Sequence, residues 1–405
     1  MEFDLLISGA GPAGLCLARA LADTGLTIGV LEQQPEAALR EAAFDGREIA
    51  LTQRSAALLR ELGLWQRIQA TDAAALSPLR DARVLNGSSP FAMLIGHSLT
   101  DRSELGWLVS NHLIRRAAYA EVKAAAETHG RITLLTGQPV SRVLAQGGNS
   151  LIEVQLADGT THAARLLVAA DSRFSATRRA LGIGASMHDF GRSMLVCQMT
   201  HEVPHHHAAW EWFDYGQTLA LLPMNDDPAT GLHRASTVLT LPHQGIERLL
   251  ALDEAAFGEE MARRYHGRLG SMQLISTRHS YPLVGVMPHR LIASRFACVG
   301  DAAVGMHPVT AHGFNFGLLS IAALADELRS AHASGKDIGG AGLLARYERR
   351  HMLATRPLYE MTRIIATLYT TEAAPAKLLR SAALHLGQRF TPFRKLVAAS
   401  LTGSL

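Results

Sequence analysis

The stretch that most constrains the fold lies at the N-terminus, in residues 3–32. An apolar run at 3–8 predicts a buried strand. After a glycine-rich turn, an apolar run with helical spacing leads to a second strand pattern at 27–31. The turn carries Gly9, Gly11 and Gly14 in the spacing Gly-x-Gly-x-x-Gly. This order of strand, turn, helix and strand predicts the first unit of a doubly wound α/β fold that binds a dinucleotide.

Each glycine of this turn has a predicted task. Gly9 permits the tight turn, Gly11 lets a pyrophosphate approach the backbone, and Gly14 lets the helix pack closely on the strand. Pro12 and Ala13 open the helix, whose unpaired N–H groups and positive dipole end favour phosphate. We therefore expect the turn to hold the diphosphate of the ligand.

An acidic residue follows at the expected distance. Glu32 lies 18 residues after Gly14, at the end of the second strand, and Gln33 comes next. A carboxylate at this place accepts hydrogen bonds from the adenosine ribose of a dinucleotide. The alternative is a glycine-rich packing turn in another α/β fold, because the glycine triplet alone is a weak signal.

Composition limits the class of protein. The chain has 405 residues, of which 48% are hydrophobic and 19% charged, enough for a large core and two interleaved domains. A net charge of +3 is well short of a nucleic-acid-binding footprint. Cys16, Cys197 and Cys298 lie far apart in apolar segments, which favours reduced, buried thiols in a cytoplasmic protein and gives no metal-binding spacing. We expect neither a signal peptide nor a membrane-spanning segment.

The rest of the chain adds further elements. Residues 111–128 predict a helix with Asn111 as its N-cap. Residues 187–281 alternate polar and aromatic residues, which predicts an antiparallel sheet covering the substrate. A buried strand at 296–299 runs into Gly300 and Asp301, and a long apolar helix ends near residue 332. Arg47 follows the second strand and either reaches the cofactor or caps a helix on the surface.

Three separated signatures now line up. They are the turn at residues 9–14, the run Asp171-Ser172-Arg173-x-Ser175, and Gly300-Asp301 with His307-Pro308 and Gly313-x-Asn315-x-Gly317 downstream. In this order they resemble the single-component FAD-dependent aromatic hydroxylases of the p-hydroxybenzoate hydroxylase type. The branch most like this chain is that of the ubiquinone-biosynthesis ring hydroxylases. The resemblance runs from residue 1 to about residue 370.

The resemblance implies an α/β architecture. A Rossmann-like FAD-binding domain of the glutathione-reductase type is interleaved with an α+β substrate domain over an antiparallel sheet, with helices at the C-terminus. The expected ranges are 1–75, 101–186 and 282–340 for the FAD-binding domain, 76–100 and 187–281 for the substrate-binding domain, and 341–405 for the C-terminal helical region.

The resemblance also implies roles for residues. FAD is the expected cofactor, and NAD(P)H is a transient co-substrate because no second glycine fingerprint occurs. Asp301 is expected at the ribityl chain, Asp171 near the pyrophosphate, and Asn111 near the flavin. The expected cofactor-binding residues are Gly9, Gly11, Pro12, Ala13, Gly14, Glu32, Gln33, Arg47, Asn111, Asp171, Gly300, Asp301, Gly313, Phe314 and Asn315. The candidates for tuning or proton relay in catalysis are His307, Pro308 and His312, although a structural role in a tight loop is the simpler interpretation of both histidines.

Four positions depart from the family pattern. Ser172 replaces a glycine, and a Cβ there resists left-handed backbone angles, which puts the turn geometry in doubt. Ala311 and His312 replace a glycine and a glutamine in the loop before Gly313, and Ser320 stands where an aspartate is common. We interpret these as features of a sub-branch.

The expected function is hydroxylation of the aromatic ring of a polyprenylated phenol or quinol in ubiquinone biosynthesis, with NAD(P)H and O₂ and through a flavin hydroperoxide. Three alternatives stay open. They are hydroxylation or halogenation of another aromatic molecule, since Trp210-Glu211-Trp212 is similar to a halogenase motif, reduction of an isoprenoid chain, and a non-catalytic subunit of a quinone-biosynthesis assembly.

The C-terminal tail is basic and amphipathic. From Lys377 onward it holds five cations and no acid, interleaved with apolar residues. Such a tail either rests on anionic lipid at the inner membrane or docks on the cofactor domain or a partner subunit. The expected location is therefore cytoplasmic, with peripheral membrane contact as an open alternative.

Overall fold

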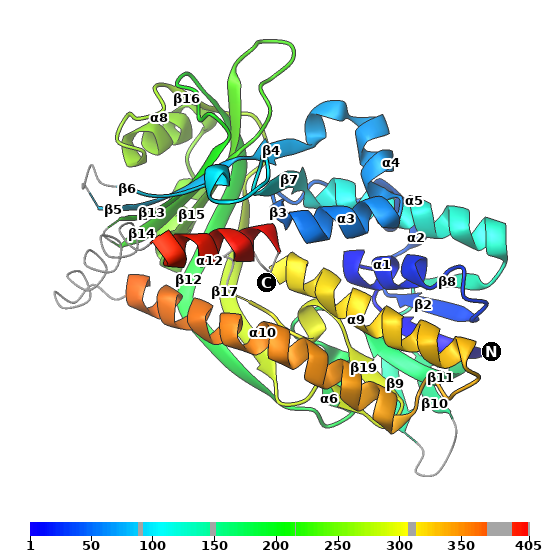
Figure 1. The fold of residues 1–405 in the computed structure, drawn as a ribbon. Coiled ribbons are helices and arrows are strands. Elements are labelled where there is room, and N and C mark those ends of the chain that lie inside the picture. Colours follow the sequence, from blue (N-terminus) through cyan, green and yellow to red (C-terminus); the bar gives the residue numbers. More distant parts are fainter. Residues whose placement is uncertain (88–91, 146–150, 215, 307–312, 371–390, 404–405) are drawn as a thin grey trace.

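The computed structural model describes residues 1–87, 92–145, 151–214, 216–306, 313–370 and 391–403. Their strands form three sheets, flanked by helices (Figure 1). The helices are α1 (Pro12–Ala20), α2 (Glu36–Glu41), α3 (Gln53–Glu61), α4 (Leu64–Thr71), α5 (Asn111–His129), α6 (Ala176–Ala180), α7 (His243–Leu250), α8 (Glu254–Arg264), α9 (Gly313–Ala333), α10 (Ala341–Thr370) and α12 (Thr391–Thr402). Short 3₁₀ turns are η1 (Ala73–Ala75), η2 (His97–Leu99) and η3 (Gly300–Ala302).

The first sheet is the nucleotide-binding type predicted from the N-terminal turn. Its strand order is β18-β19-β11-β1-β2-β8, and the β9–β10 hairpin extends from β11. The strands are β1 (Glu2–Ser8), β2 (Ile28–Glu32), β8 (Ile132–Thr136), β9 (Val140–Ala145), β10 (Ile152–Leu156), β11 (Thr161–Ala169), β18 (Ile292–Ala293) and β19 (Phe296–Cys298). Strands β19, β11, β1, β2 and β8 run parallel, so their carboxyl ends meet at one edge.

The second sheet is largely antiparallel, as predicted for residues 187–281. Its order is β16-β12-β15-β14-β13-β5-β6, with β17 also paired to β12. The strands are β5 (Asp81–Asn86), β6 (Ala92–Gly96), β12 (Ala185–His201), β13 (Ala208–Asp214), β14 (Gln217–Pro223), β15 (His233–Leu241), β16 (Met272–Leu274) and β17 (His279–Pro288). One face packs with α7 and α8 in a core that includes Trp212, Leu219 and Leu239, which are register neighbours.

A small third sheet lies between the two larger ones. It has the order β3-β7-β4, with β3 (Glu48–Thr52), β4 (Ser77–Leu79) and β7 (Gly106–Ser110). Helix α9 contacts β3 and also α1, so one helix joins this sheet to the nucleotide-binding turn. The small sheet therefore fixes how the long antiparallel sheet faces the nucleotide-binding part.

Most predicted element boundaries are confirmed, with one correction. Helix α5 covers the predicted range and ends at Gly130 in a left-handed conformation. Its N-cap is Ser110, so the prediction of Asn111 as the cap was wrong by one residue. The Asn111 side chain instead donates a hydrogen bond to Asp45. The three cysteines are buried and unbridged, as expected.

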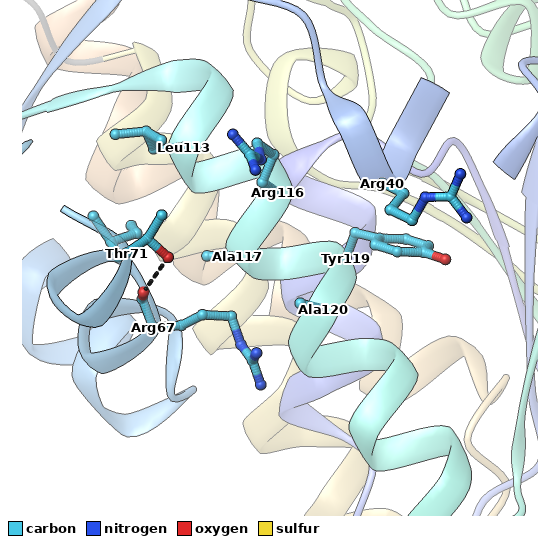
Figure 2. A pocket seen from close by; sticks show the side chains of 9 residues that line it. Arg40, Arg67, Thr71, Leu113, Arg116, Ala117, Tyr119 and Ala120 are labelled. Carbon is cyan, nitrogen blue, oxygen red and sulfur yellow. Dashed lines mark hydrogen bonds between the residues drawn. The ribbon is translucent and has the colours of Figure 1, made fainter. Parts of the chain in front are cut away.

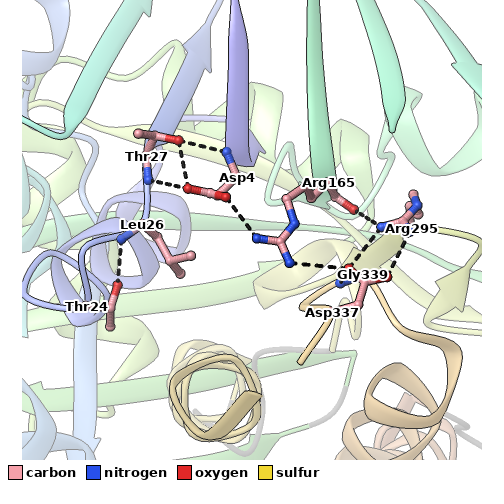
Figure 3. Close-up of polar contacts among 8 residues, drawn as sticks. All are labelled: Asp4, Thr24, Leu26, Thr27, Arg165, Arg295, Asp337 and Gly339. Atoms are coloured by element: carbon pink, nitrogen blue, oxygen red, sulfur yellow. Dashed lines mark hydrogen bonds and ion pairs between the residues drawn. The ribbon is translucent and has the colours of Figure 1, made fainter. Parts of the chain in front are cut away.

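A network of hydrogen bonds and ion pairs lies at the edge of the nucleotide-binding sheet opposite the glycine turn (Figure 3). Arg165 of β11 donates to Asp4 of β1 at 3.1 Å and lies 3.6 Å from Asp337, in the connection between α9 and α10. Arg295, beside β19, pairs with Asp337 at 2.8 Å. The network thus ties four structural segments together at the edge of the sheet away from the glycine turn.

The described part of the C-terminal tail docks on its own chain. Ala398 of α12 is buried with Met93 and Ile95 of β6. A Cβ on Gly403, just after the helix, would lie 2.9 Å from the Arg54 Cβ of α3. Residues 371–390, which carry much of the basic charge, lie outside the described residues. Among the described helices, none is sufficiently long and apolar to cross a bilayer.

Candidate functional site

The three motifs meet at one edge of the parallel sheet. Ser8, Ala169 and Cys298 are register neighbours at the carboxyl ends of β1, β11 and β19. The segments that follow these strands carry the glycine turn, Asp171 and Asp301, so all three leave the sheet side by side. A Cβ on Gly300 would lie only 2.6 Å from the Ala13 Cβ. The sequence motifs, each more than a hundred residues from the next, therefore form one site.

The three glycines of the turn differ in their surroundings. Gly9 has φ +107°, and a Cβ there would lie 2.6 Å from the Ala170 carbonyl oxygen. A Cβ on Gly14 would lie 1.9 Å from the Gly9 carbonyl oxygen. A Cβ on Gly11 would meet no atom of the described part of the chain within 4 Å. The packing roles of Gly9 and Gly14 are confirmed, and the open space at Gly11 fits the approach of a phosphate.

Glu32 is held beside the turn by backbone groups. Its Oε2 accepts from the Ala10 N–H at 2.8 Å, and its Oε1 accepts from the Gln34 N–H at 3.0 Å. Gln33 between them is exposed. The carboxylate thus stands at the end of β2 in a fixed orientation, as a ribose acceptor requires.

Asp171 presents one oxygen that the protein does not satisfy. Its Oδ2 accepts from the N–H and the hydroxyl of Thr177, at 3.0 and 2.9 Å. Its Oδ1 is buried and has no partner among the described residues. A buried carboxylate oxygen without a donor is costly, so this atom fits a donor supplied by a bound ligand.

Ser172 adopts a left-handed backbone conformation. Its φ is +87°, in the region that side chains with a Cβ resist. The turn therefore forms with serine at this position, and the backbone there is strained. This settles the doubt raised by the sequence at this position.

Two arginines link the segment that follows Asp171 to the Asp301 turn: Arg173, which belongs to the second sequence signature, and Arg178, which does not. Arg173 donates to Asp301 Oδ2 and to the Val284 carbonyl, both at 3.0 Å. The buried Arg178 donates at 3.2 Å to the carbonyls of Arg173 and Ala302. The sequence shows these arginines only as residues two and seven positions after Asp171. Their hydrogen-bond partners are visible only in the folded chain.

The Ser320 hydroxyl bridges the Gly300 turn and the first turns of α9. It accepts from the Gly300 N–H at 2.9 Å and donates to the Gly317 carbonyl at 2.6 Å. A Cβ on Gly317 would lie 3.3 Å from the Gly300 Cα. The first turns of α9 are thereby held against the Asp301 segment.

Helix α9 begins at Gly313, directly after residues that lie outside the described ranges. A Cβ on Gly313 would meet no atom of the described residues within 4 Å, while Phe314 packs partly against the main core. Asn315 is buried: its Oδ1 accepts from the Thr52 N–H at 3.0 Å and its Nδ2 donates to the Ala50 carbonyl at 2.8 Å. Asn315 therefore joins α9 to β3, and a direct contact with a cofactor stays a prediction. The predicted catalytic residues His307, Pro308 and His312 lie outside the described residues, as does Ala311.

Arg47 and Asn111 meet at a carboxylate that the sequence analysis missed. Asp45 Oδ2 accepts from Arg47 Nη2 at 2.6 Å and from Asn111 Nδ2 at 2.7 Å. Tyr281 donates to the Asp45 carbonyl at 2.7 Å, and its ring lies 5.4 Å from the Arg47 guanidinium. Burial acts to raise the pKa of Asp45, but Arg47 and these hydrogen bonds leave it below the usual value. The prediction that Arg47 and Asn111 lie near a cofactor stays open.

The same edge fits an extended dinucleotide. Gly11 and Gly313 leave space at two helix N-termini, where N–H groups attract anionic or electron-rich ligand atoms. Glu32 and Asp171 supply acceptors along the edge. Among the described residues, no cluster of three His, Cys, Asp or Glu side chains is arranged to hold a metal ion.

A separate hollow of about 210 Å³ lies between α4 and α5 (Figure 2). Three arginines border it, and one of them, Arg67, pairs with Glu121 at 2.6 Å. None of the predicted site residues lines it. The lining residues are Arg40, Arg67, Ile68, Thr71, Leu113, Arg116, Ala117, Tyr119 and Ala120. We therefore do not assign it to the site at the sheet edge.

Comparison with known proteins identifies related chains. A family model described as FAD binding domain matches residues 2–360. The ubiquinone hydroxylase UbiM of Neisseria meningitidis is 44% identical, over 100% of this chain and 85% of the relative. UbiL of Rhodospirillum rubrum, also a ubiquinone hydroxylase, is 32% identical over 99% of this chain and 90% of its own. The 3-demethoxyubiquinol 3-hydroxylase of Escherichia coli is 26% identical over 95% of both chains.

Solved structures share the fold. PqsL of Pseudomonas aeruginosa, in complex with 2-aminobenzoylacetate, matches with a TM-score of 0.75 and 22% identity, over 91% of this chain and 97% of its own. HpxO of Klebsiella pneumoniae, in complex with FAD and uric acid, matches with a TM-score of 0.73 and 19% identity, over 99% and 97%. These two similarities show that the chain shares the fold of these structures.

Proposed function

Because the chain belongs to the family defined by this FAD binding domain, we propose that it is an FAD-dependent monooxygenase of ubiquinone biosynthesis. It hydroxylates the aromatic ring of a polyprenylated phenol or quinol, using NAD(P)H and O₂. The observation that carries the proposal is the meeting of three motifs at one sheet edge, with space at Gly11 and Gly313. The 44% identity to a ubiquinone hydroxylase supports the choice of substrate class.

The chain's own residues hold the cofactor. The N-terminus of α1 and the bare backbone of Gly11 receive the diphosphate, and Glu32 receives the adenosine ribose. Asp301 receives the ribityl chain, with its carboxylate oriented by Arg173. The bound flavin supplies acceptance of a hydride from NAD(P)H and activation of O₂, which side chains do not provide.

Two further tasks fall to the protein. The N-terminus of α9 directs unpaired N–H groups toward the space at Gly313, where they stabilise negative charge on a planar ring. The antiparallel sheet covers the opposite side and excludes water from the reacting centre. His307, Pro308 and His312, which lie outside the described residues, remain the proposed groups for tuning or proton relay in catalysis.

The test uses the purified full chain. It should be yellow, and a phenolic substrate should accelerate its oxidation of NAD(P)H. With labelled O₂, the product should gain a single labelled oxygen. A halogenated product would instead favour the halogenase alternative, and saturation of a prenyl double bond would favour a reductase. Protein that takes up no FAD yet binds other quinone-biosynthesis proteins would indicate a non-catalytic subunit.

Deletion of the gene in its host gives an independent result. A quinone precursor that lacks one ring hydroxyl should accumulate, and its mass and substitution pattern identify the ring position. A normal quinone profile in a host without a second enzyme of this class would refute the proposal.

A further inference from the structure

A carboxyl group spans the junction between the two large parts of the fold. Glu48 opens β3, and its Oε1 accepts from the Ser110 hydroxyl of β7 at 2.5 Å. The same oxygen accepts from Gln198 Nε2 of β12 at 2.8 Å. Because β12 belongs to the antiparallel sheet, this side chain reaches from the nucleotide-binding part to the sheet that covers the substrate.

The second oxygen of this carboxyl is uncommitted. Glu48 Oε2 accepts no hydrogen bond from the described residues, and it is not among the fully buried atoms that lack a partner. The donors on Oε1 fix the side chain's orientation. One oxygen is therefore held by the protein while the other is presented to a ligand.

The apolar surroundings match an aromatic ligand. Gln198 is the register neighbour of Ser236, which is in turn the neighbour of Leu222. Ser236 has a buried hydroxyl with no partner among the described residues. Val196 and Val238 form the next pair on the same face, two residues further along each strand. Leu222, Val196 and Val238 offer apolar contact to a ring, and the same face also carries the polar side chains of Ser236, Arg234 and Glu211.

Glu48 is also near the proposed place of the flavin ring. Ala50, two residues further along β3, is bonded to Asn315 in the first turn of α9. At 3.3 Å per residue of strand, Glu48 is about 7 Å along β3 from that contact. A ligand ring of ordinary size bridges such a distance.

We propose that Glu48 is a catalytic residue whose Oε2 accepts the proton of the ring hydroxyl of the substrate. This rests on the proposed function. As the O–H bond breaks, its electron pair forms the C=O bond of a dienone, and ring electrons form the new carbon–oxygen bond with one oxygen atom derived from O₂. The O–O bond breaks in the same step, and the second oxygen atom leaves with that electron pair and is released as water after protonation. Loss of the ring hydrogen as a proton then restores the aromatic ring. The two electrons that reduce the other oxygen atom come from NAD(P)H.

The charge around Glu48 suits a base that works near neutral pH. Burial raises its pKa to about 7, and the negative charge of Asp45 adds to this effect. The bonds from Ser110 and Gln198 and the charge of Arg234 on β15 act in the opposite direction. Arg47 beside it and Arg115 of α5 both face Asp45. Above this pKa the carboxylate accepts a proton, and below it the group has no capacity to do so.

The experiment compares Glu48→Gln with Glu211→Gln in the FAD-loaded full chain. Glu211 of β13 is a matched control, since burial raises its pKa to about 8 on the same antiparallel sheet. Product formation by the wild type should fall below about pH 7. In E48Q, product formation at pH 8 should be slower by on the order of 10²-fold, as expected for removal of a general base. The decrease in rate below about pH 7, which is the acid limb of the pH profile, should be absent in E48Q and present in E211Q.

A second readout does not depend on turnover. Infrared difference spectra over pH should contain the carbonyl band of a carboxylic acid that titrates near pH 7 and disappears in E48Q. FAD affinity should be the same in E48Q and wild type. The inference is overturned if E48Q keeps the wild-type rate and limb, or if the limb disappears in E211Q instead. A wild type that forms no hydroxylated product would overturn the proposed function, which is a different result.

Discussion

The glycine turn allows cofactor binding and fold stability to be perturbed separately. In Gly14→Ala the new methyl group would lie 1.9 Å from the Gly9 carbonyl oxygen, which is backbone and has no rotamer to escape into. To restore an ordinary contact, α1 must move from the turn by roughly 1.5 Å, since ordinary Cβ contacts begin at 3.4 Å. Overpacking of this kind costs about 3 kcal/mol.

The net effect of Gly14→Ala is smaller than the steric cost. Alanine is about 1 kcal/mol better than glycine inside a helix, so the expected loss is about 2 kcal/mol. At about 2.1 cal/mol/K of unfolding entropy per residue, a chain of 405 residues has about 0.85 kcal/mol/K. The thermal midpoint of the FAD-free protein should therefore fall by about 2 °C, with a matching shift in denaturant midpoint.

Gly11→Ala is the matched control, because its methyl group would meet no protein atom within 4 Å. We expect stability of the FAD-free protein within about 1 kcal/mol of wild type, since Gly11 is an N-cap and alanine caps slightly less well. FAD affinity, measured by the change in flavin fluorescence on binding, should fall at least about tenfold, or about 1.4 kcal/mol. Wild-type FAD affinity in Gly11→Ala together with wild-type stability in Gly14→Ala would refute this reasoning.

Two further substitutions test the supports of the site. Ser172→Gly should stabilise the protein by about 0.5–1 kcal/mol, because relief of a left-handed serine, about 1–2 kcal/mol, exceeds the entropy cost of glycine. Ser172→Ala keeps the strain, so equal denaturant midpoints for the two variants would contradict the account. Asn315→Leu should destabilise by about 2–4 kcal/mol, since it leaves the buried Thr52 N–H and Ala50 carbonyl without partners. Asn315→Asp retains the acceptor for the Thr52 N–H, so its free energy of unfolding in urea should lie between those of wild type and Asn315→Leu. A loss of stability equal to that of Asn315→Leu would argue against this assignment.

Several features of the site were predictable from the sequence because they are local. The turn from β1 into α1 depends on a few contiguous residues, and its glycines have the backbone angle and close contacts that their spacing requires. Helix α5 begins within a residue of its predicted start, and α9 ends within a residue of the predicted end near residue 332. Resemblance to a known family supplied the interleaving of the FAD-binding and substrate-binding parts, which periodicity alone leaves open.

Other features were not predictable, because they depend on which side chains face each other after folding. Arg47 and Asn111 were both assigned to the cofactor, yet each bonds to Asp45, which carries no motif. Arg178 carried no assignment from the sequence, and in the structure it is buried and donates to the carbonyl of Ala302. The tail of the chain allowed several docking partners, and its last described helix lies on β6.

The sequence by itself determined the nucleotide-binding turn, the strand–helix alternation and the class of cofactor. Each of these depends on backbone geometry within a short stretch, or on motifs whose order survives in the linear chain. Only the tertiary structure decided that Glu48 meets Gln198, 150 residues away, across two different sheets. Such a contact depends on strand order, on register and on which face each side chain takes. A shift of one residue in either strand would turn the side chain to the other face.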